Sequence, residues 1–137
     1  MLRSADAGPS PAGISDPPRR VLVVDDNRDA ADSLAALLSI LGHDVSTAYG
    51  SQAAVDEAGT LQPDAITLDI GMPDDDGYTT ARRLRALPGG ERPLLVAVTG
   101  WDQQETRQLA VEAGFDYYLV KPPNPETLVV LLRLVRA

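Results

Sequence analysis

The stretch RVLVVDDNRDAADSLAALLSILG, residues 20–42, decides the fold. Its first part is an apolar, β-branched run that ends in two acids, which is typical of a buried strand. Its second part carries apolar residues at spacings of three and four, which predicts an amphipathic helix, and Gly42 stands where a helix C-cap is expected. A buried strand followed directly by a packed helix is the repeating unit of a parallel sheet.

The same alternation continues through the rest of the chain. The patterns predict four further strands, at residues 43–49, 64–70, 92–100 and 115–121, and four further helices, at residues 51–61, 78–87, 103–114 and 124–137. The strand at 43–49 is short and polar, so we expect it at a sheet edge. Asn124 is the expected N-cap of the last helix, with Pro125 at its first position. Five strands alternating with five helices predict a doubly wound α/β fold with helices on both faces of a parallel sheet.

Composition limits the classes of function. Residues 1–18 hold four prolines and two glycines, so we expect a disordered tail before a single domain at 19–137. The chain has no cysteine, which excludes disulfides and thiolate sites and fits a cytoplasmic protein. A net charge of −8 argues against direct binding to nucleic acid. No run approaches the roughly 18 apolar residues that span a membrane.

Polar side chains stand where four of the predicted strands end. Asp25 and Asp26 end the first, Asp69 the third, Thr99 the fourth and Lys121, the only lysine in the chain, the fifth. Each is ordinary when taken alone, as a turn residue, a helix cap or a solvated surface charge. In parallel α/β sheets the strand ends share one edge, where ligands bind. We therefore expect three carboxylates, a hydroxyl and an ammonium on one rim.

Such a rim has a defined chemistry. Crowded carboxylates repel one another and invite a cation, and oxygen ligands with room for water favour Mg²⁺ over Zn²⁺. Asp69 would keep one oxygen free to attack an electrophile. A phosphoryl group fits that role, because Mg²⁺, Lys121 and Thr99 would each engage a different oxygen of it.

The sequence resembles the receiver domain of two-component response regulators over residues 20–136. The resemblance rests on four motifs in register, VLVVDDN, LDIGMPDDDG, VAVTGW and YYLVKPP. It implies a flavodoxin-like (βα)5 fold whose five-stranded parallel sheet has the order 2-1-3-4-5. It also implies a bacterial signalling protein that accepts a phosphoryl group and is not an enzyme.

The resemblance implies roles for the rim residues. Asp69 would accept a phosphoryl group from a phosphohistidine on a sensor histidine kinase or a histidine phosphotransfer protein. Asp26, Asp69 and the backbone carbonyl of Gly71 would bind Mg²⁺, and Asp25 would hold a metal-bound water. Lys121 would pair with the phosphoryl group, aimed inward by a cis bond to Pro122.

A switch is implied as well. Thr99 and Tyr118 resemble the pair through which phosphorylation changes the surface made by the fourth helix, the fifth strand and the fifth helix. Leu128, Leu131, Leu132 and Val135 form the expected core stripe of the last helix, whereas Val129, Val130 and Leu134 lie off it. That apolar excess predicts a docking face for a downstream protein target or a homodimer.

Some alternatives remain open. An aspartate-nucleophile phosphatase would share Asp69 but needs an acid two residues later, where this chain has Gly71. The natural-looking start at Met1 favours a single-domain regulator, although a receiver domain excised from a hybrid histidine kinase would read in the same way. His43 is the only histidine, and we expect it to be an ordinary surface residue and not a phosphoryl donor.

Overall fold

The structure is a computed structural model of the 137-residue chain, and it describes residues 17–71, 76–100 and 104–135. The predicted disordered tail, residues 1–18, lies outside the described residues except for Pro17 and Pro18. Five strands and five helices alternate in the described part of the chain. They are β1 (Arg20–Val24), α2 (Arg28–Ile40), β2 (Asp44–Ala48), α3 (Ser51–Leu61), β3 (Ala65–Asp69), α4 (Gly77–Ala86), β4 (Leu94–Thr99), α5 (Gln104–Ala113), β5 (Tyr117–Val120) and α6 (Pro125–Leu132).

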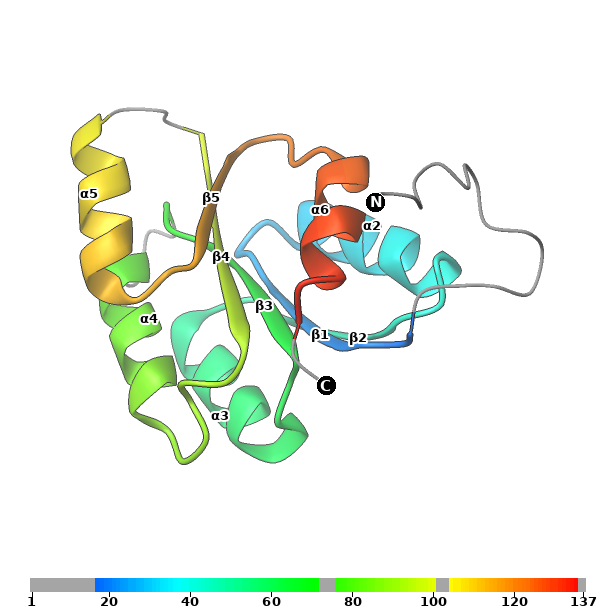
Figure 1. The fold of residues 1–137 in the computed structure, drawn as a ribbon, viewed down its shortest axis with the longest axis horizontal. Helices are drawn as coiled ribbons and strands as arrows, with labels where there is room; N and C mark the ends of the chain where they lie inside the picture. The colour runs from blue at the N-terminus through cyan, green and yellow to red at the C-terminus, as the bar shows by residue number, and fades with distance from the viewer. Residues whose placement is uncertain (1–16, 72–75, 101–103, 136–137) are drawn as a thin grey trace, which may run out of the picture.

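The strands form one parallel sheet in the order β2-β1-β3-β4-β5 (Figure 1). The polar strand β2 lies at one edge. The predicted flavodoxin-like fold and its strand order are thus confirmed. Because β1 and β3 are neighbours in the middle of the sheet, the segments that follow them lie side by side at its carboxyl edge.

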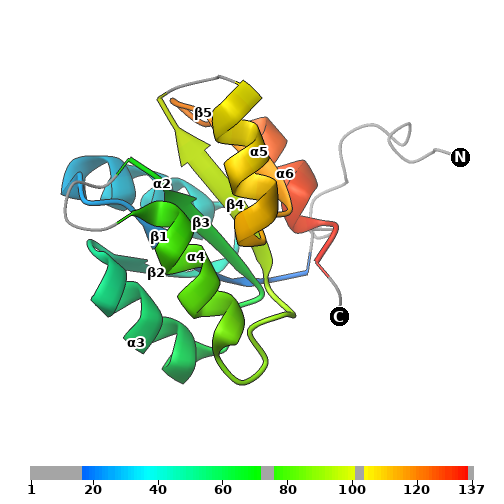
Figure 2. The ribbon, with the colours of Figure 1, turned by 90° about the vertical axis from the view of Figure 1, so that its left-hand side faces the viewer.

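Helices cover both faces of the sheet, and strand side chains alternate between them. Leu22 and Val24 of β1 belong to the core cluster on the face covered by α3, α4 and α5. Val21 and Val23 belong to the cluster on the opposite face, with residues of α2 and α6. Figure 2 shows α4 and α5 in front of the sheet. The central strands are buried on both sides, which explains their nearly continuous apolar sequences.

Side-chain caps fix where three helices begin. Asn27 Oδ1 accepts the N–H of Ala30 at 3.0 Å at the start of α2. Asp76 caps α4 in the same way. The predicted cap of α6 is confirmed, since Asn124 Oδ1 accepts the N–H of Glu126 at 2.8 Å and Pro125 is the first helical residue.

Two expectations from the sequence are wrong. The helix predicted at 124–137 ends at Leu132, because Arg19 reaches across and donates from Nε to the Leu132 carbonyl and from Nη2 to the Val135 carbonyl, each at 3.2 Å. Nor is His43 a surface residue. It is buried, and its Nδ1 accepts the backbone N–H of Arg19 at 3.1 Å.

None of the helices in the described ranges is both long enough and apolar enough to cross a membrane.

Candidate functional site

The polar side chains singled out in the sequence lie at the carboxyl edge of the sheet. Asp25 directly follows β1, Asp69 is the last residue of β3 and Thr99 is the last residue of β4. Lys121 directly follows β5, and its N–H donates to the Thr99 carbonyl at 2.7 Å. The sheet itself therefore sets the spacing of these groups, and no loop has to fold back to bring them together.

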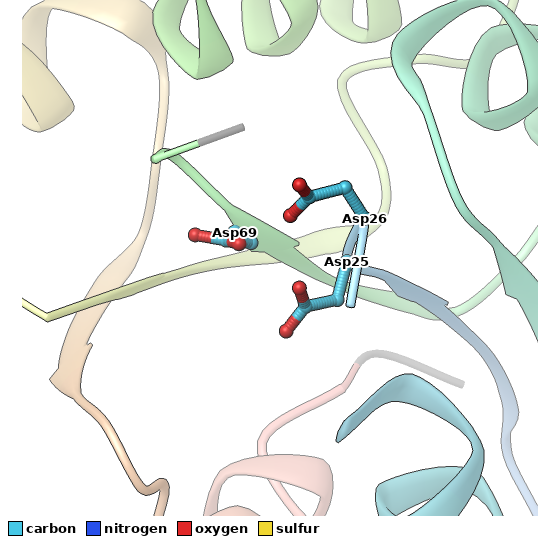
Figure 3. Close-up of side chains that lie close together, drawn as sticks. All are labelled: Asp25, Asp26 and Asp69. Carbon is cyan, nitrogen blue, oxygen red and sulfur yellow. The ribbon is translucent and has the colours of Figure 1, made fainter. Parts of the chain in front are cut away.

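Three carboxylates are crowded at this edge. Asp25, Asp26 and Asp69 each offer an oxygen, and the three oxygens lie within 4.8 Å of one another. Figure 3 shows the two neighbouring acids at the end of β1 and Asp69 at the end of β3. Asp25 and Asp69 are buried, whereas Asp26 is exposed.

Backbone N–H groups orient two of the three carboxylates. The N–H of Asn27 donates to Asp25 Oδ1 at 3.0 Å, and the N–H of Gly71 donates to Asp69 Oδ1 at 2.9 Å. Both contacts span two residues, so each acid is held by the turn that directly follows it. One oxygen of each carboxylate is thereby fixed, while the other faces Lys121.

Lys121 bridges the two buried acids. Its Nζ lies 3.0 Å from Asp69 Oδ2 and 3.2 Å from Asp25 Oδ2. The peptide bond between Lys121 and Pro122 is cis, as the resemblance implied. A single ammonium thus reaches acids at the ends of two neighbouring strands, β1 and β3.

The electrostatic consequences follow from burial and from this ion pairing. Burial raises the pKa of Asp25 above its ordinary value, and nearby Asp69 raises it further, against the lowering effects of the Asn27 N–H and Lys121. Burial alone would lower the pKa of Lys121. The hydrogen bond and charge of Asp69, together with the charge of Asp25, outweigh burial and raise that pKa above 10.5. The ammonium therefore stays charged at neutral pH.

The residues at this edge fit a divalent cation. Three carboxylates meet one ammonium, which leaves an excess of negative charge in a partly buried place. The donor atoms in the cluster are oxygens, and hard cations such as Mg²⁺ prefer oxygen, whereas zinc favours nitrogen and sulfur. Burial and the neighbouring Asp69 raise the pKa of Asp25, and a bound cation would oppose both effects because it stabilises the charged carboxylate.

Thr99 and Tyr118 lie on one face of the sheet. Thr99 pairs with Val120 and Ala97 pairs with Tyr118, and residues two apart on a strand point to the same side. Ala97 belongs to the core cluster under α3, α4 and α5, and the half-buried Tyr118 packs against that cluster. Thr99 is only 2% exposed. The hydroxyl and the aromatic ring are therefore neighbours on the side covered by α5.

Two residues near the site were missed by the sequence analysis. Asn27 both caps α2 and holds Asp25 through its N–H, and its signal was an asparagine directly before a helical pattern. Arg107 of α5 lies over the Tyr118 ring, with its guanidinium carbon 5.6 Å from the ring centroid. No local pattern in the sequence indicates the contact between Arg107 and Tyr118.

The chain is similar in sequence to known proteins. The sequence model of the response regulator receiver domain matches residues 21–133. The response regulator MprA of Mycolicibacterium vanbaalenii is 40% identical over 116 residues, which cover 85% of this chain and 49% of that protein. The chain thus spans about half the length of the MprA relatives it matches.

Solved structures agree. Chemotaxis protein CheY4 of Vibrio cholerae is 28% identical with a TM-score of 0.81, and the match covers 88% of this chain and 100% of that one. The receiver domain of sensor histidine kinase PA1611 from Pseudomonas aeruginosa PAO1 has a magnesium ion coordinated in its active site cleft. It is 31% identical with a TM-score of 0.78, and the match covers 87% of this chain and 98% of that one. The chain belongs to the response regulator receiver domain family of two-component systems.

Proposed function

We propose that Asp69 is the phosphoacceptor, and that its donor is a phosphohistidine of a sensor histidine kinase or a histidine phosphotransfer protein. The observation that carries this proposal is the bridge from Lys121 to Asp25 and Asp69, beside the exposed carboxylate of Asp26. Receiver domains are generally signalling domains. The buried Asp69 at a strand end, oriented by the Gly71 N–H, has the fixed position that a nucleophile needs.

The proposed transfer is a single displacement at phosphorus. A carboxylate oxygen of Asp69 forms a bond to phosphorus while the bond from phosphorus to the histidine nitrogen breaks. The electron pair of the broken bond stays on the imidazole of the donor. Lys121 then pairs with the new acyl phosphate, and the Thr99 hydroxyl donates to one of its oxygens. Because phosphoryl transfer depends mainly on positioning and charge neutralisation, the chain needs no separate acid or base.

A magnesium ion fits this chemistry. Asp26, Asp69 and the carbonyl of Gly71 would hold it directly, and Asp25 would hold it through a water molecule. When bound, Mg²⁺ supplies positive charge against the phosphoryl oxygens. The all-oxygen cluster and the magnesium in the PA1611 neighbour support this assignment.

Acetyl phosphate, a small phosphoryl donor, provides the test. We expect one phosphoryl group per chain when Mg²⁺ is present, located on Asp69 by peptide mass spectrometry. Asp69→Asn should abolish labelling, whereas Asp56→Asn, at another aspartate on α3, should not affect it. Labelling of a different residue, or none at all in a folded protein with Mg²⁺, would refute the phosphoacceptor role.

We also propose that phosphorylation switches the face made by α5, β5 and α6 through Thr99 and Tyr118. Apolar side chains are exposed on these three elements, which supports docking of a downstream protein target or of a second copy. They are Leu109, Val111, Tyr117, Val120 and Val130. Size-exclusion chromatography with and without beryllofluoride, which mimics the phosphoryl group, distinguishes the two partners. A change of elution volume that depends on protein concentration indicates a homodimer.

The biological context stays a prediction. We propose a single-domain regulator without enzymatic turnover, and the alternative is a receiver domain from a hybrid histidine kinase. The mass of the protein in its native cell separates the two. Residue Gly71, where an aspartate-nucleophile phosphatase needs an acid, supports the non-enzyme. We also propose a cytoplasmic location, as the sequence predicts.

A further inference from the structure

Arg107 and Tyr118 make a contact that belongs to no part of the acid cluster. Arg107 is an exposed residue of α5, and Tyr118 is a half-buried residue of β5. The guanidinium carbon lies 5.6 Å from the centroid of the tyrosine ring, within the roughly 6 Å over which a cation is attracted by an aromatic face. The contact therefore joins α5, which covers one face of the sheet, to the edge strand β5.

The position of the Tyr118 ring connects this contact to Thr99. Tyr118 pairs with Ala97, and Thr99 lies two residues further along β4 on the same face. Two residues of a strand span about 6.6 Å. Thr99 is thus the next residue of β4 on the face where the ring lies. A ring that turned towards Thr99 would leave the guanidinium of Arg107, so the contact stabilises the present arrangement and not the turned one.

We propose that Arg107 is a positioning residue that holds the Tyr118 ring in its present place and thereby sets how readily the switch turns. This inference rests on the proposed switch role of Thr99 and Tyr118. A cation over an aromatic ring at an exposed site changes an equilibrium by about two- to fivefold. Because the contact exists in one state only, its loss shifts the population of the two states by that factor.

The effect of the positive charge must be distinguished from the effect of side-chain packing, because the arginine stem also covers apolar surface. Arg107→Met keeps an unbranched apolar side chain and removes the charge. Arg107→Lys keeps a cation. Arg82→Met removes an exposed arginine from α4 and serves as the matched control.

Fluorine NMR of the full chain labelled with 3-fluorotyrosine reads the ring directly. The chain has four tyrosines, and Tyr118→Phe assigns the resonance of Tyr118. In untreated protein we expect Arg107→Met to displace that resonance, and Arg107→Lys and Arg82→Met to leave it near the parent position. We then expect Arg107→Met to lower, by about two- to fivefold, the beryllofluoride concentration that half-converts the resonance in the presence of Mg²⁺. Magnesium affinity without beryllofluoride should not change, whereas damage to the fold would alter it.

Two results would overturn the proposal. One is a Tyr118 resonance in untreated Arg107→Met that coincides with the parent. The other is an Arg107→Lys protein that behaves like Arg107→Met, since a cation would then not be what holds the ring. Failure of the phosphoacceptor role looks different, because the parent itself would then show no response to beryllofluoride. The displacement in untreated Arg107→Met would still be present in that case and would support the contact.

Discussion

At the scale of the residue, Lys121 offsets the repulsion between two buried acids. Its Nζ lies within 3.2 Å of an oxygen of both Asp25 and Asp69. An arginine would present a broad planar fork there, whereas an ammonium is a compact point charge on a flexible stem. The same compactness suits a pocket that must also admit a phosphoryl group. One amine therefore balances the acids at rest and would serve the phosphoryl group after transfer.

The titration of Lys121 can be followed without assignment, because the chain has no other lysine. We expect the ¹³Cε signal of the metal-free protein to titrate with a pKa above 10.5, because Asp69 and Asp25 outweigh the lowering effect of burial. A raised folded-state pKa means that this contribution to stability is complete below pH 10.5 and is lost as the pH rises through the folded value. Asp69→Asn should lower the midpoint. A parent midpoint at or below 10.5 would contradict the ion pairing.

A second prediction concerns Asp26. The carboxylate oxygens lie within 4.8 Å of one another, and two charges at about that separation repel by about 3 kcal/mol at an effective dielectric constant near 20. Solvent at the exposed Asp26 reduces this repulsion to about 1 kcal/mol. Asp26→Asn should therefore stabilise the metal-free protein by about 1 kcal/mol and weaken Mg²⁺ binding. Thermal unfolding in EDTA and titration with Mg²⁺ measure the two effects. Asp29→Asn, in the first turn of α2, is the control and should not stabilise. If Asp26→Asn melts below the parent in EDTA, the carboxylates do not repel as we infer.

The sequence predicted which residues lie at the rim, because each of them ends a strand and the strands are parallel. It could not predict how they are held. The N–H of Asn27 on Asp25 and that of Gly71 on Asp69 depend on turn geometry. Burial of His43 likewise depends on Arg19, a residue far away in the chain, whose N–H the imidazole accepts.

At the scale of the element, α4 begins in direct contact with the segment that follows the proposed phosphoacceptor. Gly77, the first residue of α4, is buried against Ile70. A Cβ built on Gly77 would collide with the Ile70 backbone and lie 2.8 Å from its Cβ. Ile70 directly follows Asp69, so the start of this helix fixes the end of β3.

We expect Gly77→Ala to destabilise the protein by about 1–3 kcal/mol, as overpacking does, and to slow labelling of Asp69 by acetyl phosphate. Gly59→Ala is the control. Gly59 lies inside α3 with no atom within 4 Å of an added Cβ, so alanine there should stabilise by about 0.5–1 kcal/mol. Urea unfolding and labelling rates test both. Equal stability of Gly77→Ala and the parent would show that Ile70 gives way without strain.

The sequence predicted which segments are helices and which are strands, but it predicted their boundaries less accurately. The helix at Ser51–Leu61 has the predicted bounds, since a glycine precedes it and a left-handed Gln62 follows it. The end of α6 was predicted too late, because its final carbonyls are bound by Arg19, which is 113 residues from Leu132 in the chain. Apolar periodicity continues past Leu132, so periodicity alone cannot mark such an end.

At the scale of the whole molecule, one arginine ties together the segments at the end of the sheet opposite the proposed site. Arg85 of α4 donates to the carbonyls of Gly90, Pro93 and Gly114 at 2.8–3.0 Å. It also pairs with Asp116 at 2.9 Å, and Asp116 in turn accepts the N–H of Leu95. The connections before β4 and before β5 are thus tied to α4 at a single side chain. None of these partners could be paired with Arg85 from the sequence, since most of them are backbone carbonyls in turns.

This network predicts that substitution of Arg85, which is half-buried and far from the acids, destabilises the protein strongly. Arg85→Met keeps the apolar stem but removes the guanidinium donor from three carbonyls and the ion pair from Asp116, so we expect a loss of about 2–3 kcal/mol in the free energy of unfolding. The urea midpoint should fall while the m-value stays constant, because the surface exposed on unfolding is nearly unchanged. Arg82→Met, an exposed arginine one turn earlier on α4, should change the midpoint little. Labelling of Asp69 in the folded Arg85→Met protein should continue, because Arg85 holds the opposite end of the strands. A variant as stable as Arg82→Met would show that water replaces the guanidinium at no cost, and that the two connections are held by their own turns.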